Sequence, residues 1–225
     1  MSPDIVDLPP TQALNEKFAA EYGFTWLGVE KFPVTTTDFM PVVSRALERK
    51  PDAINTMNTV GSMGPTGYLL IKQLRQAGYK GIIWLRGAAD SRMLREIVGE
   101  ENLYGIIESG VQKESPLVPE AYRELMDRYE KEYGMEFLDV VGEYYNPTKA
   151  FLEFLDGQDT WDTDVWAQEF GNYRWTGIFG KSFWGGEPLY GIKRICVHRH
   201  FVSEWIDGKR ITKMFELPPA SLAGE

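Results

Sequence analysis

Segments with strand-like and helix-like patterns alternate along the first half of the chain, and this alternation constrains the fold most strongly. The strand-like segments are 24–32, 52–57, 81–87 and 103–112, and the helix-like segments are 11–22, 37–49, 68–79 and 90–99. A helix of about ten residues between successive strands provides the crossover that parallel strands require. The pattern therefore predicts an α/β fold built on a doubly wound parallel sheet.

The pattern changes after residue 110. The stretch VQKESPLVP (111–119) contains two prolines and predicts a crossover out of the sheet. Beyond it, the sequence predicts two helices, a Trp-rich segment and alternating strands joined at Asp207-Gly208, over 120–133, 142–156, 161–184 and 190–216.

Composition limits the classes of partner. The chain has 225 residues, 43% of them hydrophobic, so it can bury a core. Its 33 acidic against 24 basic residues give a net charge of −9, which disfavours nucleic acid and anionic membrane surfaces as partners. Cys196 is the only cysteine, so no intrachain disulfide can form. The first 23 residues lack the basic start and long apolar run of a signal peptide, which predicts a cytoplasmic protein if this is the whole gene product.

Four segments in a fixed order carry a family resemblance: KFPVTTTDFMPVVSRALERKPDAI, IKQLRQAGYKGIIWLRGAADSRMLREIVGEENLYGIIES, EAYRELMDRYEKEYG and YGIKRICVHRHFVSEWIDGKRI. Together they resemble the solute-binding proteins of branched-chain amino-acid (Leu/Ile/Val) ABC transporters, which are type I periplasmic binding proteins. The resemblance runs from about residue 11 to about residue 216 and so covers most of the chain.

The resemblance implies two α/β lobes that close around a small solute in the cleft between them, for recognition by an ABC permease. Residues 1–113 then correspond to most of the second lobe, 114–189 to part of the first lobe, and 190–225 to the strands that return to the second lobe. It also implies a periplasmic or extracytoplasmic protein that is not an enzyme and needs no cofactor. A cytosolic ligand-sensing domain of the same fold is the alternative.

The sequence departs from the family at its start. Most of the first lobe and the strand that opens the second lobe have no counterpart, and MSPDIVDLPP is too short and proline-rich to supply that strand. We therefore expect a truncated, split or unusually short family member. A sheet without one of its strands exposes backbone and apolar surface, which predicts a homodimer, exchanged elements or a companion polypeptide.

Ligands of such folds bind beyond the carboxyl ends of the parallel strands, which places the first candidates after segment 52–57. Backbone amides and hydroxyl groups in this loop can hydrogen-bond a carboxylate, and the alternative is a turn that faces water. The predicted ligand-binding residues in this loop are Asn58, Thr59, Gly61 and Ser62.

The second candidate loop follows segment 81–87 and contains Arg86 and Asp90. By the resemblance, Arg86 stands where amino-acid-binding members commonly have a glutamate that pairs with the ligand ammonium. A guanidinium repels an ammonium and binds a carboxylate with two hydrogen bonds, which predicts an anionic ligand. The alternative is a salt bridge from Arg86 to Asp90 or Glu108.

Tyr144 and Tyr145 correspond to positions near the hinge and cleft of the family. Their rings can form a wall for an apolar ligand, although tyrosines at such positions also serve packing.

Two further patterns suggest other chemistry. Four tryptophans and four acids in one segment suggest glycoside hydrolysis. The alternative is that the tryptophans form an aromatic core and the acids lie on the surface. The residues are Trp161, Trp166, Trp175, Trp184, Asp159, Asp162, Asp164 and Glu169.

His198 and His200 form an H-x-H pattern that places both rings on one face of a strand. The sequence supplies no third ligand near them, so we predict solvent-facing histidines and no metal site.

Overall fold

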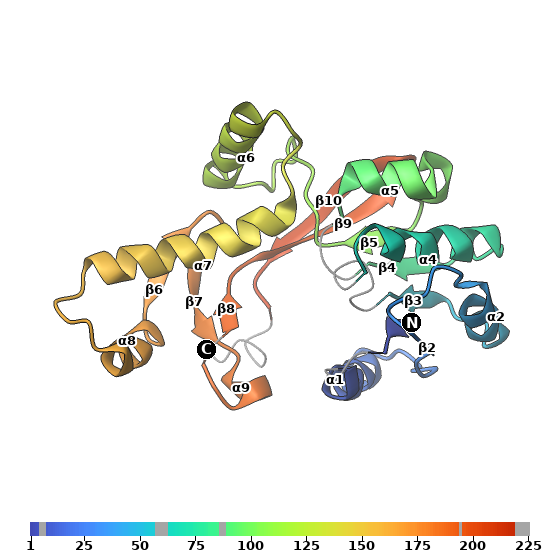
Figure 1. The fold of residues 1–225 in the computed structure, drawn as a ribbon, viewed down its shortest axis with the longest axis horizontal. Helices are drawn as coiled ribbons and strands as arrows, with labels where there is room; N and C mark the ends of the chain where they lie inside the picture. The colour runs from blue at the N-terminus through green and yellow to red at the C-terminus, as the bar shows by residue number, and fades with distance from the viewer. Residues whose placement is uncertain (5–7, 57–62, 86–88, 194, 219–225) are drawn as a thin grey trace. The chain divides into compact units, whose positions relative to one another are not determined.

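The computed structural model describes residues 1–4, 8–56, 63–85, 89–193 and 195–218 (Figure 1). Contacts divide the chain into two compact units, Met1–Ser109 with Glu204–Arg210 and Gly110–Ser203 with Ile211–Glu225. Among the described residues, no helix is long and apolar enough to cross a membrane.

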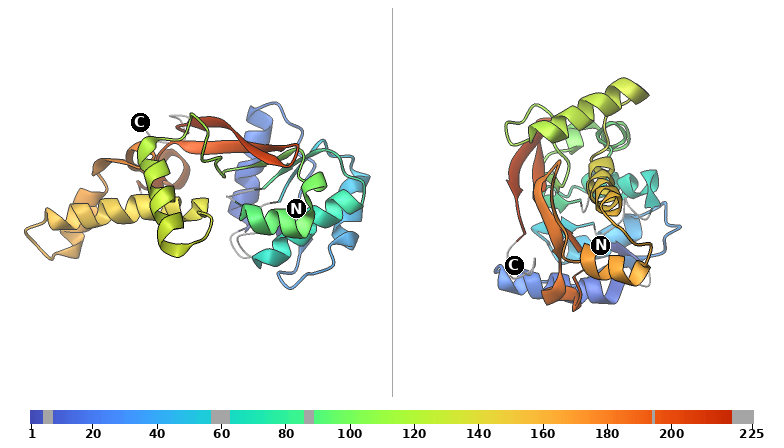
Figure 2. Two further views of the ribbon diagram at one scale, coloured as in Figure 1. Left: turned by 90° about the horizontal axis from the view of Figure 1, so that it is seen from above. Right: turned by 90° about the vertical axis from the view of Figure 1, so that its left-hand side faces the viewer.

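A five-stranded sheet has the order β10-β9-β5-β4-β3, and within the first unit it comprises the three parallel strands and residues 204–206 and 209–210 of the β9-β10 hairpin. Its parallel part consists of β3 (Ala53–Asn55), β4 (Ile82–Trp84) and β5 (Ile106–Glu108). The strands β9 (His200–Ile206) and β10 (Lys209–Glu216) are joined at Asp207-Gly208, where both residues have positive φ, as a tight hairpin turn requires (Figure 2).

Three helices pack side by side in this unit, α2 (Met40–Glu48), α4 (Pro65–Gln76) and α5 (Ser91–Val98) (Figure 1). A short 3-10 helix, η1 (Glu100–Asn102), follows α5. Each helix buries apolar residues at helical spacing in one core with the buried isoleucines of the three parallel strands, Ile54, Ile83 and Ile106. The predicted alternation of parallel strands and helices is therefore confirmed for residues 40–108.

The start of the chain differs from the expectation. A short strand is present there, because β1 (Ser2–Pro3) pairs in parallel with β2 (Lys31–Phe32). The Met1 nitrogen also donates to the Asn55 carbonyl at 2.7 Å, so this segment contacts β3 as well. The prediction that residues 1–10 supply no strand is thus wrong. The helix α1 (Leu8–Glu21) follows, and the strand predicted over 24–32 is limited to β2.

A buried ion pair connects β5, β9, β10 and the start of α5. The Glu108 carboxylate has no exposed side-chain surface, and it accepts hydrogen bonds from Arg210 Nε at 2.9 Å and from Trp205 Nε1. Its other oxygen accepts from the Ala89 backbone N–H at 2.6 Å. Arg210 also donates to the Ala89 carbonyl at 3.0 Å. Because both charges are removed from water, the pair depends on these hydrogen bonds.

The second unit combines helices with a three-stranded antiparallel sheet of order β6-β7-β8. Its elements are α6 (Glu120–Tyr133), α7 (Asp139–Asp156), α8 (Thr163–Phe170), β6 (Arg174–Gly177), β7 (Gly180–Gly185), α9 (Glu187–Tyr190) and β8 (Ile195–Val197). The helices α6 and α7 fall close to the two predicted ones, whereas α8 was not predicted.

An aromatic core holds α6 and α7 together in the second unit. The Tyr122 ring contacts Phe137, Phe179 and Phe201 at centroid distances of 5.1–5.6 Å. Its hydroxyl donates to the buried Asp139 carboxylate at 3.1 Å, at the first turn of α7. Tyrosine thus supplies both core volume and a hydrogen bond that satisfies a buried charge.

We predict that Glu108→Ala lowers the free energy of unfolding by about 3–5 kcal/mol, because it leaves the Arg210 guanidinium buried without its partner charge. Urea unfolding followed by circular dichroism measures this change. The double variant Glu108→Leu with Arg210→Met removes both charges and should recover most of the loss. As a control, Glu153→Ala removes an exposed ion pair with Lys149 and should cost less than about 1 kcal/mol. A Glu108→Ala cost no larger than that of the control would contradict the assigned role.

Candidate functional site

The carboxyl ends of β3 and β4 meet at one edge of the sheet in the first unit. Asn55 of β3 stands opposite Trp84 of β4, and the Thr56 backbone N–H donates to the Trp84 carbonyl at 2.9 Å. The two predicted ligand loops therefore leave the sheet from neighbouring strands. The predicted residues Asn58, Thr59, Gly61, Ser62 and Arg86 lie outside the described residues.

Asp90 has a structural role at the start of α5. Its side chain accepts a hydrogen bond from the Met93 backbone N–H at 3.0 Å, which caps the helix. Its own backbone N–H donates to the Tyr68 hydroxyl at 2.9 Å. Burial raises the pKa of Tyr68 to about 12, so this hydroxyl stays protonated. The second Asp90 carboxylate oxygen lies 3.9 Å from the exposed Arg92.

Glu108, the other acid considered as a partner of Arg86, is bonded to Arg210, Trp205 and Ala89. Sequence reasoning did not find Arg210, which is separated from Glu108 by 102 positions. The only local signal was a charged residue directly after the apolar pair of β5. Such a residue indicates that a partner is needed without showing which one.

The two predicted tyrosines lie on α7 with different surroundings. Tyr144 is 72% exposed, whereas Tyr145 packs against the aromatic core of the second unit. Tyr145 also lines a hollow of about 480 Å³ between α6, α7 and β6. Within the described part of the chain, Asn146 Oδ1 and Trp175 Nε1 beside this hollow are buried and have no hydrogen-bond partner.

The Trp-rich segment is largely an aromatic cluster. Trp175 and Trp184 contact each other at 5.6 Å, and Phe170 and Tyr173 pack beside them. Among the four acids, Asp162 caps α8 by accepting from the backbone N–H groups of Asp164 and Val165. This arrangement favours the packing interpretation of the segment over a sugar-binding one.

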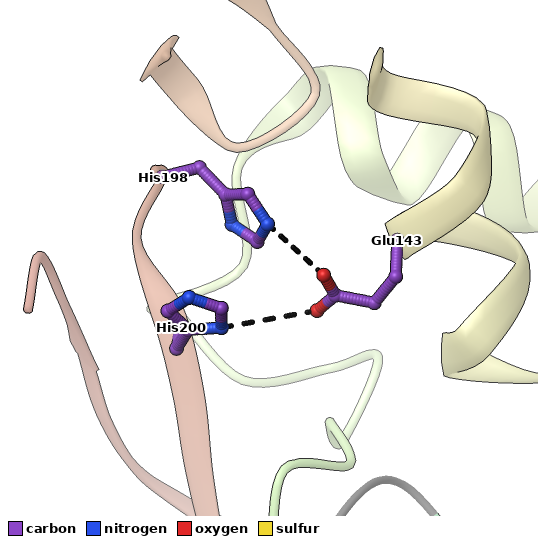
Figure 3. Close-up of side chains that lie close together, drawn as sticks. All are labelled: Glu143, His198 and His200. Atoms are coloured by element: carbon purple, nitrogen blue, oxygen red, sulfur yellow. Dashed lines mark ion pairs between the residues drawn. The ribbon is translucent and has the colours of Figure 1, made fainter. Parts of the chain in front are cut away.

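The structure brings a carboxylate close to the two histidines (Figure 3). Sequence reasoning identified the histidines and missed this carboxylate. Glu143 of α7 approaches His198 Nε2 at 2.9 Å and His200 Nδ1 at 4.0 Å. His198 is only 2% exposed, so the prediction of solvent-facing histidines is wrong for this residue. Burial lowers the pKa of His200, and His198 lowers it further while Glu143 raises it. No local spacing in the sequence relates residue 143 to residue 198.

Comparisons with known proteins agree with this fold. Residues 10–197 match the model of the periplasmic binding protein family. No curated protein matches the chain. A leucine binding protein (LivK) from Thermotoga maritima is structurally similar, with a TM-score of 0.73 and 19% identity over 96% of this chain and 60% of that one.

Two further solved structures are similar to the chain. LivJ from Streptococcus pneumoniae, in complex with isoleucine, has a TM-score of 0.73 and 15% identity over 96% of this chain and 59% of that one. A solute binding protein from R. palustris, in complex with benzoate, has a TM-score of 0.69 and 13% identity over 96% of this chain and 57% of that one.

The chain thus spans about 60% of the length of these relatives. The match to the family model extends over most of the sequence, and the fold is that of the type I periplasmic binding proteins. The chain therefore belongs to the periplasmic binding protein family.

Proposed function

We propose that the chain is the solute-binding component, or a part of one, of an ABC importer that takes up a small carboxylate or amino-acid-like ligand. The observation that carries this proposal is the pairing of β3 with β4, which brings two loops rich in polar groups to one edge of the sheet. In parallel α/β sheets this edge is the usual place for a ligand. The family match supports the same function.

The proposed ligand carries a negative charge that Arg86 recognises. Glu108 already accepts three hydrogen bonds, including one from Arg210, and Asp90 uses one oxygen as a helix cap. Glu108 therefore already has a charged partner in Arg210, and we propose that the partner of Arg86 is an anionic ligand. The same ligand is proposed to accept or donate hydrogen bonds in the loop after β3, with Asn58, Thr59, Gly61 and Ser62. Asp90 is proposed to position the loop after β4, which contains Arg86.

Tyr145 is the better supported of the two tyrosines as a ligand contact. It lines a hollow beside buried polar atoms for which the described residues supply no hydrogen-bond partner, whereas Tyr144 faces solvent. The proposed partners are ABC permease subunits, and the proposed location is periplasmic or extracytoplasmic. A cytosolic sensor with the same ligand chemistry is the second candidate.

We predict that the chain binds benzoate more tightly than leucine in isothermal titration calorimetry, because a guanidinium attracts the carboxylate and repels the ammonium. Arg86→Ala should weaken benzoate binding by about 10–100-fold, since a hydrogen bond to a charged group contributes about 1.5–3 kcal/mol. Arg92→Ala is the matched control, because it removes an arginine whose side chain is 72% exposed. Tight binding of leucine without binding of any small carboxylate would contradict the proposal.

We also propose that a second polypeptide covers one face of the sheet, as a homodimer or with a companion chain. Ile82 and Trp84 project from the same face of β4 and are 45% and 50% exposed. Apolar side chains in the middle of a sheet are usually covered by another layer.

Light scattering should accordingly give the isolated chain a mass above its monomer mass of 25.7 kDa. Trp84→Thr should shift the chain toward the monomer, because it removes apolar surface and keeps a residue that suits a strand. Tyr133→Thr on α6, which removes a 65% exposed aromatic ring, should leave the mass unchanged. A wild-type chain that is a stable, well-folded monomer would contradict association.

A further inference from the structure

Two histidines and one glutamate of the second unit converge on a common point (Figure 3). Glu143 extends from α7, while His200 opens β9 and His198 precedes it by two residues. One ligand atom from each residue lies within 4.8 Å of the others. We propose that these three side chains form a binding site for a divalent transition metal ion, for which Zn²⁺ fits best.

The orientation of His198 supports this assignment. Its Nδ1 lies 2.8 Å from the Arg199 carbonyl oxygen, which can only accept, so Nδ1 carries the hydrogen and donates a hydrogen bond to that oxygen. The Phe179 ring stacks on the imidazole at 4.3 Å with an interplanar angle of 11°. Metal-binding histidines are typically fixed in this way, with one ring nitrogen hydrogen-bonded and the other directed at the ion.

The facing atoms also need a positive charge. In neutral His198, the Nε2 lone pair points toward a Glu143 oxygen 2.9 Å away, and two acceptors at this distance repel each other. Either a proton on Nε2 or a cation bound by both groups removes the repulsion. The position of His200, whose ring lies 4.3 Å from that of His198, favours the cation, because it adds a third donor atom.

The set of donors matches zinc chemistry. Two imidazoles and one carboxylate, with bonds of about 2.0–2.2 Å and one open coordination position, are a common zinc ligand set. The side chains of Glu143 and His200 are 40% and 47% exposed, so they can rotate to close the 4.0 Å gap between them and leave the open position to solvent. Cys196, two residues before His198, is not among the three converging groups.

A bound ion would link α7 to the start of β9 within the second unit. It would stabilise that unit increasingly as the free ion concentration rises above the dissociation constant, because the unfolded chain does not hold the three groups together. This site is independent of the solute site proposed for the first unit.

Isothermal titration calorimetry of the full chain with Zn²⁺ tests the proposal, and the visible absorption of a Co²⁺ complex reports the ligand geometry. We expect one equivalent of Zn²⁺ to bind and to raise the melting temperature, with reversal by a chelator. His200→Ala and Glu143→Gln should each weaken binding by about 100-fold or more, since even outer partners of metal ligands contribute about 10–100-fold.

Both substituted side chains are partly exposed, so the variants should fold, which circular dichroism verifies. Glu153→Gln is the matched control, because it changes an exposed acid of the same helix and should leave the affinity unchanged. Absence of Zn²⁺ binding by the wild-type chain would overturn the proposal and favour a simple ion pair between Glu143 and protonated His198. Binding that persists unchanged in His200→Ala would overturn it as well.

Discussion

The buried contact between Glu108 and Arg210 determines how the first unit is assembled. A carboxylate without exposed surface is stable only when charge and hydrogen bonds compensate for the lost water, and here Arg210, Trp205 and Ala89 provide them. These partners come from β10, β9 and the residues before α5. The pair therefore fixes the end of β5 and the start of α5 at the edge of the sheet where the proposed ligand loops begin.

The sequence predicted those parts of the fold that depend on local periodicity. The helices α2, α4, α5 and α6, the parallel strands β3–β5 and the turn at Asp207-Gly208 follow from spacing and turn chemistry within a few residues. The contacts between distant residues could not be predicted, because no spacing rule relates Glu108 to Arg210 or Glu143 to His198. The short strand β1 was missed for a related reason: two residues carry no periodicity, and their conformation is set by β2 and Asn55.

The two units differ in what they are proposed to bind. In the first unit, the carboxyl ends of β3 and β4 lie side by side, and the proposed ligand loops follow these two strands. The second unit holds Glu143, His198 and His200 beside an aromatic core that orients the buried ring. The chain spans about 60% of the length of these relatives. The proposed solute function is therefore assigned to a chain that corresponds to only part of their structure.

Nuclear magnetic resonance of the isotope-labelled chain during titration with benzoate tests most directly whether the ligand binds at the carboxyl ends of β3 and β4, as proposed. We predict shift changes concentrated in residues 57–62 and 86–88 and in the adjoining Thr56, Leu85 and Ala89. Shift changes confined to the hollow beside Tyr145, or the absence of any change at saturating benzoate, would contradict it.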